Sequence, residues 1–340
     1  MHFATSSMTK LLVAGMLLSA ANAVHAQTAM KMVLDWNIEG QHSPYALAVD
    51  SGIFAKHGLS VTVDRGSSSG DTVTKVAAGT YDVGLADLGS IIAFNAKQGG
   101  IKLITIFQAY DQAPSSIMSI KGYGVATPAD LNGKKIAAPV GDSSRVMFPL
   151  FAKANNVDAA SIQWVDVTAA LRRAVLMQHQ VDAISGQTSE VITFRTLGVK
   201  DADLIVFRYS DLGVKIYGHA IFTTPEYAAS HQNELKQFLA AVAEAWKATI
   251  KDPKASIAVI KKWNPLIDEA IELQRLDLML HDAIAPPDVV KNGFSKVDPA
   301  RLKYTVDSVT LAFNLPTVAN ATELWHPEFL PPASELQYPK

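Results

Sequence analysis

The stretch that decides the fold runs from Met30 to Val63 and reads MKMVLDWNIEGQHSPYALAVDSGIFAKHGLSVTV. Its first part, Met30–Asp35, is mostly apolar and predicts a buried strand. Pro44–Ser51 has helical spacing and is followed by Gly52, a residue that commonly ends helices. Leu59–Val63 alternates apolar and polar side chains, which predicts a second strand. A strand, a helix and a strand in this order are typical of α/β proteins with mostly parallel sheets.

The same alternation continues along the chain in two blocks. The first block adds expected strands at Asp82–Leu85 and Ile101–Gln108 and helices at Asp71–Ala78 and Ser90–Gln98. An extended segment, Ser115–Lys121, leads into the second block. Strands are expected there at Lys135–Ala138, Ile162–Val165, Asp182–Ser185 and Leu204–Val206, and helices at Arg145–Asn155, Ala169–Gln178 and Ser189–Leu197. Ile216–Thr223 is extended again, and helices are expected beyond it at Gln232–Lys251, Pro253–Trp263, Asp268–Ala283 and Asp298–Phe313.

A chain that leaves one α/β unit, builds a second and returns by another extended segment has the layout of a two-lobe clamp. The two crossing segments form a hinge, and a ligand binds in the cleft between the lobes. We expect lobe one to comprise residues 28–118 and 220–340, and lobe two to comprise residues 119–219. The length supports this division, because more than 300 residues exceed a comfortable single core.

The N-terminus has the pattern of a cleavable secretory signal peptide over residues 1–26. Lys10 provides a positive charge, Leu11–Leu18 is an unbroken apolar run, and Val24 and Ala26 place small side chains before the expected cleavage site. The apolar run is shorter than the roughly 20 residues that a membrane-spanning helix needs, although a lone membrane helix is the alternative. The chain contains no cysteine, so it lacks the residue that carries a lipoprotein anchor. We therefore expect a protein that is free in the periplasm.

Charge excludes two classes of partner. Removal of residues 1–26 from the 340-residue chain takes away Lys10 and no acid, which leaves 29 basic and 32 acidic residues and a net charge of −3. No run of basic residues is present, so neither nucleic acid nor an anionic membrane is an expected partner.

Several motifs resemble a known superfamily. Leu34-Asp35-Trp36 is followed by His42, Pro44 and Tyr45, and then by Gly52-Ile53-Phe54-Ala55-Lys56-His57-Gly58-Leu59. This pattern resembles the periplasmic binding proteins for nitrate, taurine, aliphatic sulfonates and thiamine-pyrimidine precursors, and is most similar to the pyrimidine-precursor branch. Further matching motifs follow in order at Gly79–Gly84, Leu131–Ala137 and Gln180–Ala183, so that the resemblance covers nearly all of residues 30–250.

The resemblance implies a two-lobe periplasmic binding fold of type II, with two mostly parallel sheets and a two-strand hinge. It implies a monomer that delivers a small-molecule ligand to the permease and cytoplasmic ATPase of an ABC importer, with no cofactor, no metal and no catalysis. The same branch contains the fungal enzyme that makes the thiamine pyrimidine, which relies on a cysteine-rich segment and iron.

Candidate ligand contacts follow from where strands end, since ligands of α/β lobes meet the loops and helix N-termini beyond the carboxyl ends of strands. In the loop after the first strand, Trp36 offers a stacking face and His42 a hydrogen-bonding edge, with Asn37 and Tyr45 beside them. In the alternative interpretation, Trp36 is a core residue and His42 caps a helix. Two further loops of lobe one contribute the candidates Ser68, Ser69, Asp87 and Leu88, whose alternative role is helix capping.

The strongest candidates in lobe two lie on a glycine turn that opens a helix. This turn carries Gly141, Asp142, Ser143, Ser144 and Arg145. Arg145 offers a guanidinium fork that suits a ligand carboxylate, or it pairs with Asp142 or another acid.

Three regions supply the remaining candidates. Gln187 and Glu190 follow another strand of lobe two, and Glu190 stands about where pyrimidine-binding relatives place an acid. Tyr110 and Tyr217 lie near the expected hinge. The sequence thus predicts a small planar ligand, either a pyrimidine-like ring or an aromatic carboxylate.

Other functions receive less support. The chain lacks a Gly-x-Ser-x-Gly elbow, a His-Glu-x-x-His motif, a phosphate-binding Gly-x-x-x-x-Gly-Lys-Ser/Thr loop and a Gly-x-Gly-x-x-Gly motif after a strand. A pyrimidine synthase is disfavoured because the chain has no cysteine. Binding of an aliphatic sulfonate, taurine or nitrate is the alternative within the superfamily, and a periplasmic partner of a sensor kinase would look the same in sequence.

Overall fold

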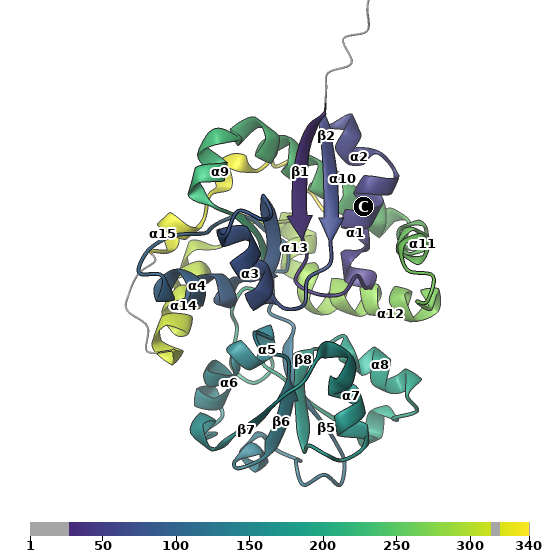
Figure 1. The fold of residues 1–340 in the computed structure, drawn as a ribbon, viewed down its shortest axis with the longest axis vertical. Coiled ribbons are helices and arrows are strands. Elements are labelled where there is room, and N and C mark those ends of the chain that lie inside the picture. The colour runs from purple at the N-terminus through teal and green to yellow at the C-terminus, as the bar shows by residue number, and fades with distance from the viewer. Residues whose placement is uncertain (1–26, 314–319, 340) are drawn as a thin grey trace, which may run out of the picture.

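The computed structural model describes residues 27–313 and 320–339, and the expected signal peptide lies outside them. Figure 1 shows two bodies, one above the other, joined by chain segments between them. We call the elements around the first sheet lobe one (residues 27–113, 217–313 and 320–339) and those around the second sheet lobe two (residues 114–216).

The first sheet has the strand order β2-β1-β3-β10-β4. Its strands are β1 Thr28–Val33, β2 Leu59–Asp64, β3 Val83–Asp87, β4 Ile104–Gln108 and β10 His219–Thr223. The helices of lobe one are α1 Ser43–Asp50, α2 Ile53–Lys56, α3 Ser69–Ala77, α4 Leu88–Lys97, α9 Pro225–Ser230, α10 Gln232–Lys251, α11 Pro253–Trp263, α12 Glu269–Met279, α13 Pro287–Asn292, α14 Pro299–Ala312 and α15 Ala321–Leu324.

The second sheet has the order β7-β6-β8-β5-β9. Its strands are β5 Ser115–Ile120, β6 Lys135–Ala138, β7 Gln163–Asp166, β8 Ala183–Gln187 and β9 Leu204–Arg208. The helices of lobe two are α5 Ser143–Val146, α6 Phe148–Ala154, α7 Ala169–Met177 and α8 Glu190–Thr196.

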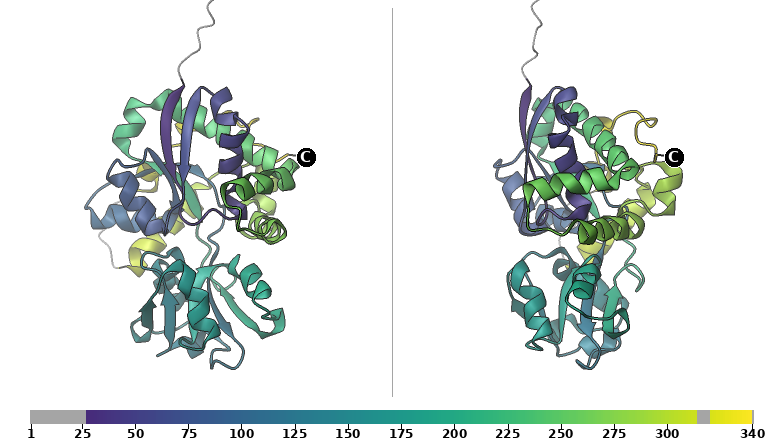
Figure 2. Two further views of the ribbon diagram at one scale, coloured as in Figure 1. Left: turned by 45° about the vertical axis from the view of Figure 1, so that its right-hand side comes forward. Right: turned by 90° about the vertical axis from the view of Figure 1, so that its right-hand side faces the viewer.

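Both sheets are mixed, and their antiparallel pairs involve the strands that follow a lobe crossing. In the first sheet β1 runs parallel to β2 and β3, whereas β10 is antiparallel to β3 and β4. In the second sheet β6 runs parallel to β7 and β8, whereas β5 is antiparallel to β8 and β9. The crossing segments hydrogen-bond to each other, because Gly218 N donates to Tyr110 O at 3.1 Å and Ala113 N donates to Ile216 O at 3.3 Å. Both views of Figure 2 show these segments as a narrow connection. The two-lobe α/β fold with a two-strand hinge is therefore confirmed.

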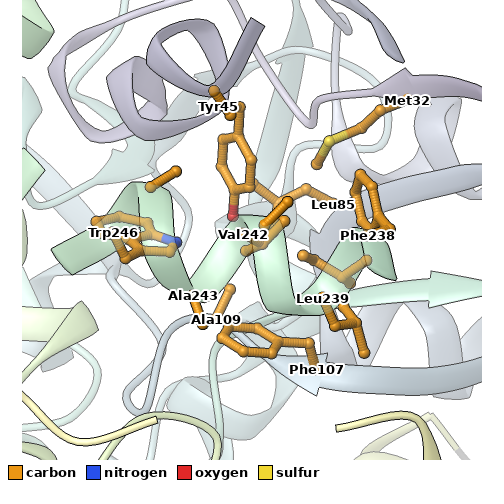
Figure 3. Close-up of a cluster of buried hydrophobic side chains, with 14 of the residues drawn as sticks. Met32, Tyr45, Leu85, Phe107, Ala109, Phe238, Leu239, Val242, Ala243 and Trp246 are labelled. Carbon is orange, nitrogen blue, oxygen red and sulfur yellow. The ribbon is translucent and has the colours of Figure 1, made fainter. Parts of the chain in front are cut away.

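The core of lobe one is built by α10 against the first sheet. Trp246 and Phe238 of α10 are fully buried, and the edge of Tyr45 packs on Trp246 with 6.1 Å between ring centroids. Figure 3 shows Tyr45 pointing into this cluster. The C-terminal Pro-rich segment, residues 327–339, buries Phe329 and Leu336 in the same core.

Two helices differ from the expected elements, and a proline accounts for the first difference. The helix expected at Arg145–Asn155 is two helices, since Met147 separates α5 from α6 and Pro149 lies in the first turn of α6. The helix expected at Asp268–Ala283 ends at Met279 and continues as a π-helical turn, Leu280–Ile284. Among residues 27–313 and 320–339, no helix is long and apolar enough to cross a membrane.

Candidate functional site

A small cavity lies between the two lobes at the carboxyl ends of their strands. Its walls come from both sides: Asp35, Trp36, Glu39, Ser68 and Ser69 of lobe one, and Asp142, Ser143, Arg172, Gln187, Ser189 and Glu190 of lobe two. The cavity measures about 20 Å³, which is room for about one water molecule. The lobes are therefore closed tightly on each other.

Arg172 extends from the lobe-two wall toward Trp36 of lobe one. It comes from α7 and is only 1 % exposed. Its guanidinium carbon lies 5.2 Å from the ring centroid of Trp36 across the cleft, within the range of a cation–π contact. Trp36 itself is 9 % exposed.

Two carboxylates of lobe two accept hydrogen bonds from the guanidinium of Arg172. Its Nη1 donates to Asp142 Oδ2 at 3.1 Å, and its Nη2 donates to Glu190 Oε1. Arg173 Nη1 donates to the other oxygen of Glu190 at 2.7 Å. Burial by itself would raise the pKa of Glu190, but the charges of Arg172 and Arg173 outweigh it and lower that pKa. Glu190 and Asp142 outweigh the effect of burial on Arg172 and raise its pKa, so Arg172 and Glu190 both stay ionised.

Asp35 forms the base of the cavity and bonds to three side chains. Its Oδ1 accepts from His42 Nε2 and its Oδ2 from His219 Nε2, both at 3.0 Å. His42 Nδ1 accepts from the backbone N–H of Glu39 at 3.2 Å, which fixes Nε2 as the protonated nitrogen. Gln187 of lobe two donates to Asp35 Oδ2 at 3.2 Å.

The imidazoles of this cluster decide its charge. Burial opposes ionisation of Asp35, but the nearby His219 and His42 more than compensate and lower its pKa well below the ordinary value. Burial would lower the pKa of His219, but the Asp35 carboxylate raises it. Asp35 and His219 therefore each favour the ionised form of the other within this buried cluster.

A second link between the lobes lies beside the cavity, where α12 faces α8 (Figure 1). Arg275 of α12 is 4 % exposed and donates from Nη1 to Ser189 O at 3.2 Å and from Nη2 to Thr193 Oγ1 at 3.0 Å. Its Nε donates to Glu272 Oε2 at 3.1 Å, and the same oxygen accepts from Gly40 N at 2.6 Å. Arg275 thus connects the loop that carries Glu39 to the start of α8.

The structure brings together seven of the residues expected from the sequence. Trp36, Ser68, Ser69, Asp142, Ser143, Gln187 and Glu190 line the one cavity. Local structure explains several of these positions, since Ser68 caps α3 and Asp142 caps α5. The loop with Trp36 and the glycine turn with Asp142 therefore face each other across the cleft.

Other candidates lie next to the cavity without lining it. His42 contacts Asp35, and Gly141 O accepts a bond from Gly70 N of lobe one at 3.3 Å. The hydroxyl of Ser144 donates to Gly186 O at 2.8 Å. Asp87 and Leu88 are fully buried at the start of α4, where Asp87 Oδ1 caps the helix by accepting from Ser90 N at 3.1 Å.

Five candidates point elsewhere. Arg145 pairs with Asp166 at 2.5 Å and lies 4.9 Å from the ring of Trp164, because its side chain extends over β7 and away from the cavity. Arg145 therefore has the alternative role expected for it, a pair with an acid, and does not line the cavity. Asn37 bonds to Arg65 at 3.0 Å in a separate groove, and Tyr45 points into the core of lobe one. The ring of Tyr110 packs at a tilt against His219 with 4.7 Å between centroids, and the hydroxyl of Tyr217 accepts from Asp298 N at 2.8 Å.

Four residues that line the cavity were not expected from the sequence: Asp35, Glu39, Arg172 and Ser189. Asp35 lies within the Leu-Asp-Trp motif, so its position next to Trp36 could have indicated it. Arg172 lies in the first turn of α7, a helix that looks like an ordinary surface helix in sequence. Within the described part of the chain, no group of three or more His, Cys, Asp or Glu side chains is arranged to hold a metal ion.

Comparisons with known proteins identify the family and relatives of this chain. Residues 39–256 match the family model described as NMT1/THI5 like. A formylaminopyrimidine-binding protein of Halalkalibacterium halodurans is 21% identical over 268 residues, which cover 77% of this chain and 80% of that protein. A 4-amino-5-hydroxymethyl-2-methylpyrimidine phosphate synthase of Legionella pneumophila is 19% identical over 239 residues, covering 70% and 75% of the two chains.

Solved structures share the fold at low sequence identity. The periplasmic aliphatic sulphonate binding protein SsuA of Escherichia coli superposes with a TM-score of 0.68 at 18% identity, covering 88% of this chain and 92% of its own. The periplasmic nitrate-binding protein NrtA of Synechocystis PCC 6803 gives a TM-score of 0.61 at 13% identity, with 85% and 86% covered. The fold is thus that of the periplasmic binding proteins, and the chain belongs to the NMT1/THI5 like family.

Proposed function

We propose that this protein is the periplasmic solute-binding component of an ABC importer and that it captures a small planar nitrogen heteroaromatic molecule between its lobes. The observation that carries the proposal is the shared cavity, in which Trp36 of lobe one faces Asp142 and Glu190 of lobe two. An indole supplies a stacking face for a flat ring, and carboxylates accept hydrogen bonds from ring amino groups.

The charges of the cavity favour a pyrimidine-like ring over an aromatic carboxylate. Four carboxylates line it, those of Asp35, Glu39, Asp142 and Glu190, against one guanidinium. The Arg145 that would have bound a ligand carboxylate is paired with Asp166 outside the cavity. The name of the Halalkalibacterium relative supports the same ligand class.

The mechanism is a population shift between open and closed clamps. Because the closed cavity admits little more than a water molecule, a ring can enter only when the lobes separate. A ligand that contacts both walls then favours a clamp closed around it, with the lobes farther apart than in this structure, since only such closure makes both sets of contacts. The closed form is the one that the permease would recognise.

A binding role is better supported than catalysis. The Legionella relative is named a synthase. The fungal synthase that the sequence resembles relies on a cysteine-rich segment, however, and this chain has no cysteine. The charged groups of the cavity are paired with one another, which suits a binding site that releases its ligand unchanged.

Calorimetry on the mature protein tests the proposal with four probes: a 4-aminopyrimidine, benzoate, taurine and nitrate. We expect the aminopyrimidine to bind most tightly and Trp36→Ala to weaken it by more than about tenfold, since lost stacking and burial exceed about 1.4 kcal/mol. Trp164→Ala, on the surface of lobe two next to Arg145, is the matched control and should leave the affinity unchanged. Tighter binding of benzoate, taurine or nitrate than of the aminopyrimidine would reject the proposed ligand class.

A further inference from the structure

We propose that Glu190 and Asp142 act as built-in anions that occupy the donor edges of Arg172 and thereby exclude free anions from the cavity. The proposal rests on the proposed function and names the residues that set its specificity. It assigns to these two acids a role in selection between ligands, beyond that of contacting them.

The geometry of Arg172 carries the first step. A guanidinium recognises planar anions by donating two parallel hydrogen bonds from adjacent nitrogens. In this structure Nη1 is directed to Asp142 Oδ2 and Nη2 to Glu190 Oε1, so each terminal nitrogen already has a carboxylate. The remaining donor, Nε, is buried without a hydrogen-bond partner in the structure.

The position of Arg172 carries the second step. It is the one arginine among the residues that line the cavity, and its guanidinium lies against Trp36 where the two lobes meet. Gly186 makes room for this guanidinium, because a Cβ at that position would lie 3.2 Å from the guanidinium carbon. An anion entering the cleft would therefore meet a guanidinium that is already paired with two carboxylates, one of them shared with Arg173, and would lie close to both acids.

Electrostatics decides between attraction and repulsion. Like charges brought together in a buried site repel each other strongly, and specific sites use such repulsion against wrong ligands. Removal of one acid should make the cavity attract anions, because it leaves a buried guanidinium without one of its carboxylate partners. A small anion from solution can then take the place of the deleted charge. Fold neighbours of this chain include sulfonate- and nitrate-binding proteins, so the scaffold itself is compatible with anions.

The experiment uses nitrate as probe, because it is planar, small and suited to a guanidinium edge. Binding to the mature wild type, Glu190→Gln and Asp142→Asn is measured by calorimetry and thermal shift in Tris–chloride at constant ionic strength. Both substitutions keep the size of the side chain, and asparagine keeps an oxygen that can cap α5. Asp166→Asn is the matched control, since it removes the exposed carboxylate partner of the half-buried Arg145 by the same chemistry outside the cavity.

We expect nitrate to bind each of the two cavity variants at least about tenfold more tightly than it binds the wild type or Asp166→Asn. If a cavity variant unfolds in chloride, nitrate should restore its folded state, since the anion replaces the lost charge. Submillimolar binding of nitrate to the wild type would overturn the proposal. Cavity variants that neither bind nitrate nor regain structure in it would do the same.

The two proposals fail separately. The proposed function depends on aminopyrimidine binding by the wild type, whereas this inference depends on the gain of nitrate binding by the variants. A wild type that binds the ring while the variants stay indifferent to nitrate would leave the binding function standing and remove the role of the built-in anions.

Discussion

Gln187 of lobe two donates a hydrogen bond to Asp35 of lobe one across the cleft, with 3.2 Å between Nε2 and Oδ2. The acceptor, Asp35, also bonds to His219. His219 lies on β10, the strand that returns from the hinge. Closure therefore brings a neutral donor from one lobe onto a buried carboxylate of the other. Hydrogen bonds to charged groups are the stronger ones in proteins, so this contact favours the closed clamp.

Replacement of Gln187 tests that contribution. Gln187→Ala removes the donor, and we expect a larger open population and ligand affinity about tenfold lower, given about 1.5 kcal/mol for such a bond. Because the chain has no cysteine, spin labels can be placed at Gln274→Cys on α12 and Thr196→Cys on α8 without other labelling. The distance between them should lengthen in the variant. An unchanged distance distribution would mean that this bond does not bias closure.

Arg275 and Thr193 should act as a pair in the same assay. Thr193→Val keeps the shape of the side chain and deletes the acceptor of Arg275 Nη2, so it should open the clamp modestly. Arg275→Ala should open it further, because the bond to Ser189 O is lost as well. In the double variant the effect of Thr193→Val should largely disappear, since its partner is already gone.

The control for this pair is Thr196→Val on the same helix. The hydroxyl of Thr196 bonds only to Thr193 O, the backbone of its own helix, and reaches no residue of lobe one. For this measurement the label on α8 moves to Leu197→Cys. Full additivity of the Arg275 and Thr193 effects, or an equal effect of Thr196→Val, would argue against a direct link between the lobes.

Much of this arrangement could be predicted from sequence because local rules decide it. Alternating strands and helices gave the two sheets, and the loops after strands gave Trp36 and Asp142, since a parallel sheet gathers its functional loops at one edge. Glycine and serine at helix starts marked the turns. These signals are short in range and survive without knowledge of the partner lobe.

The rest depended on contacts between distant segments. Arg172 is 30 residues from Asp142 and 18 from Glu190, and nothing near it in sequence shows that α7 turns it toward the cleft. Arg145 looked like a ligand contact because it shares a turn with Asp142, yet its partner Asp166 lies on the neighbouring strand. Tyr110 and Tyr217 were correctly placed at the hinge, but their rings serve packing there.

Asp87 should make the stability of the protein depend on pH. Burial raises its pKa to about 6 despite the opposing charge of His219. Between the unfolded pKa of 3.8 and the folded value of about 6, the folded state binds more protons than the unfolded state. Stability therefore falls as the pH rises through this window, by about 3 kcal/mol in total.

Asp87→Asn removes this dependence and keeps an oxygen for the bond from Ser90 N. We expect the variant to gain stability relative to the wild type between pH 4 and pH 7, as measured by urea unfolding at each pH. A difference between variant and wild type that stays constant over this range would show that Asp87 does not titrate there.

Gly40 should tolerate no side chain. A Cβ at this position would lie 2.1 Å from the backbone oxygen of Glu272 and 2.9 Å from Leu276 N, atoms of α12 that cannot rotate away. Gly40→Ala must push α12 from the loop that carries Glu39, and overpacking of this kind costs about 2–3 kcal/mol. Gly100→Ala is the matched control, since no atom lies within 4 Å of its added Cβ, and it should change stability by less than about 1 kcal/mol. Because Gly40 N also bonds to Glu272, the displacement should loosen Arg275 and open the clamp in the spin-label assay. Equal stability of the two alanine variants would mean that α12 is not held against this loop.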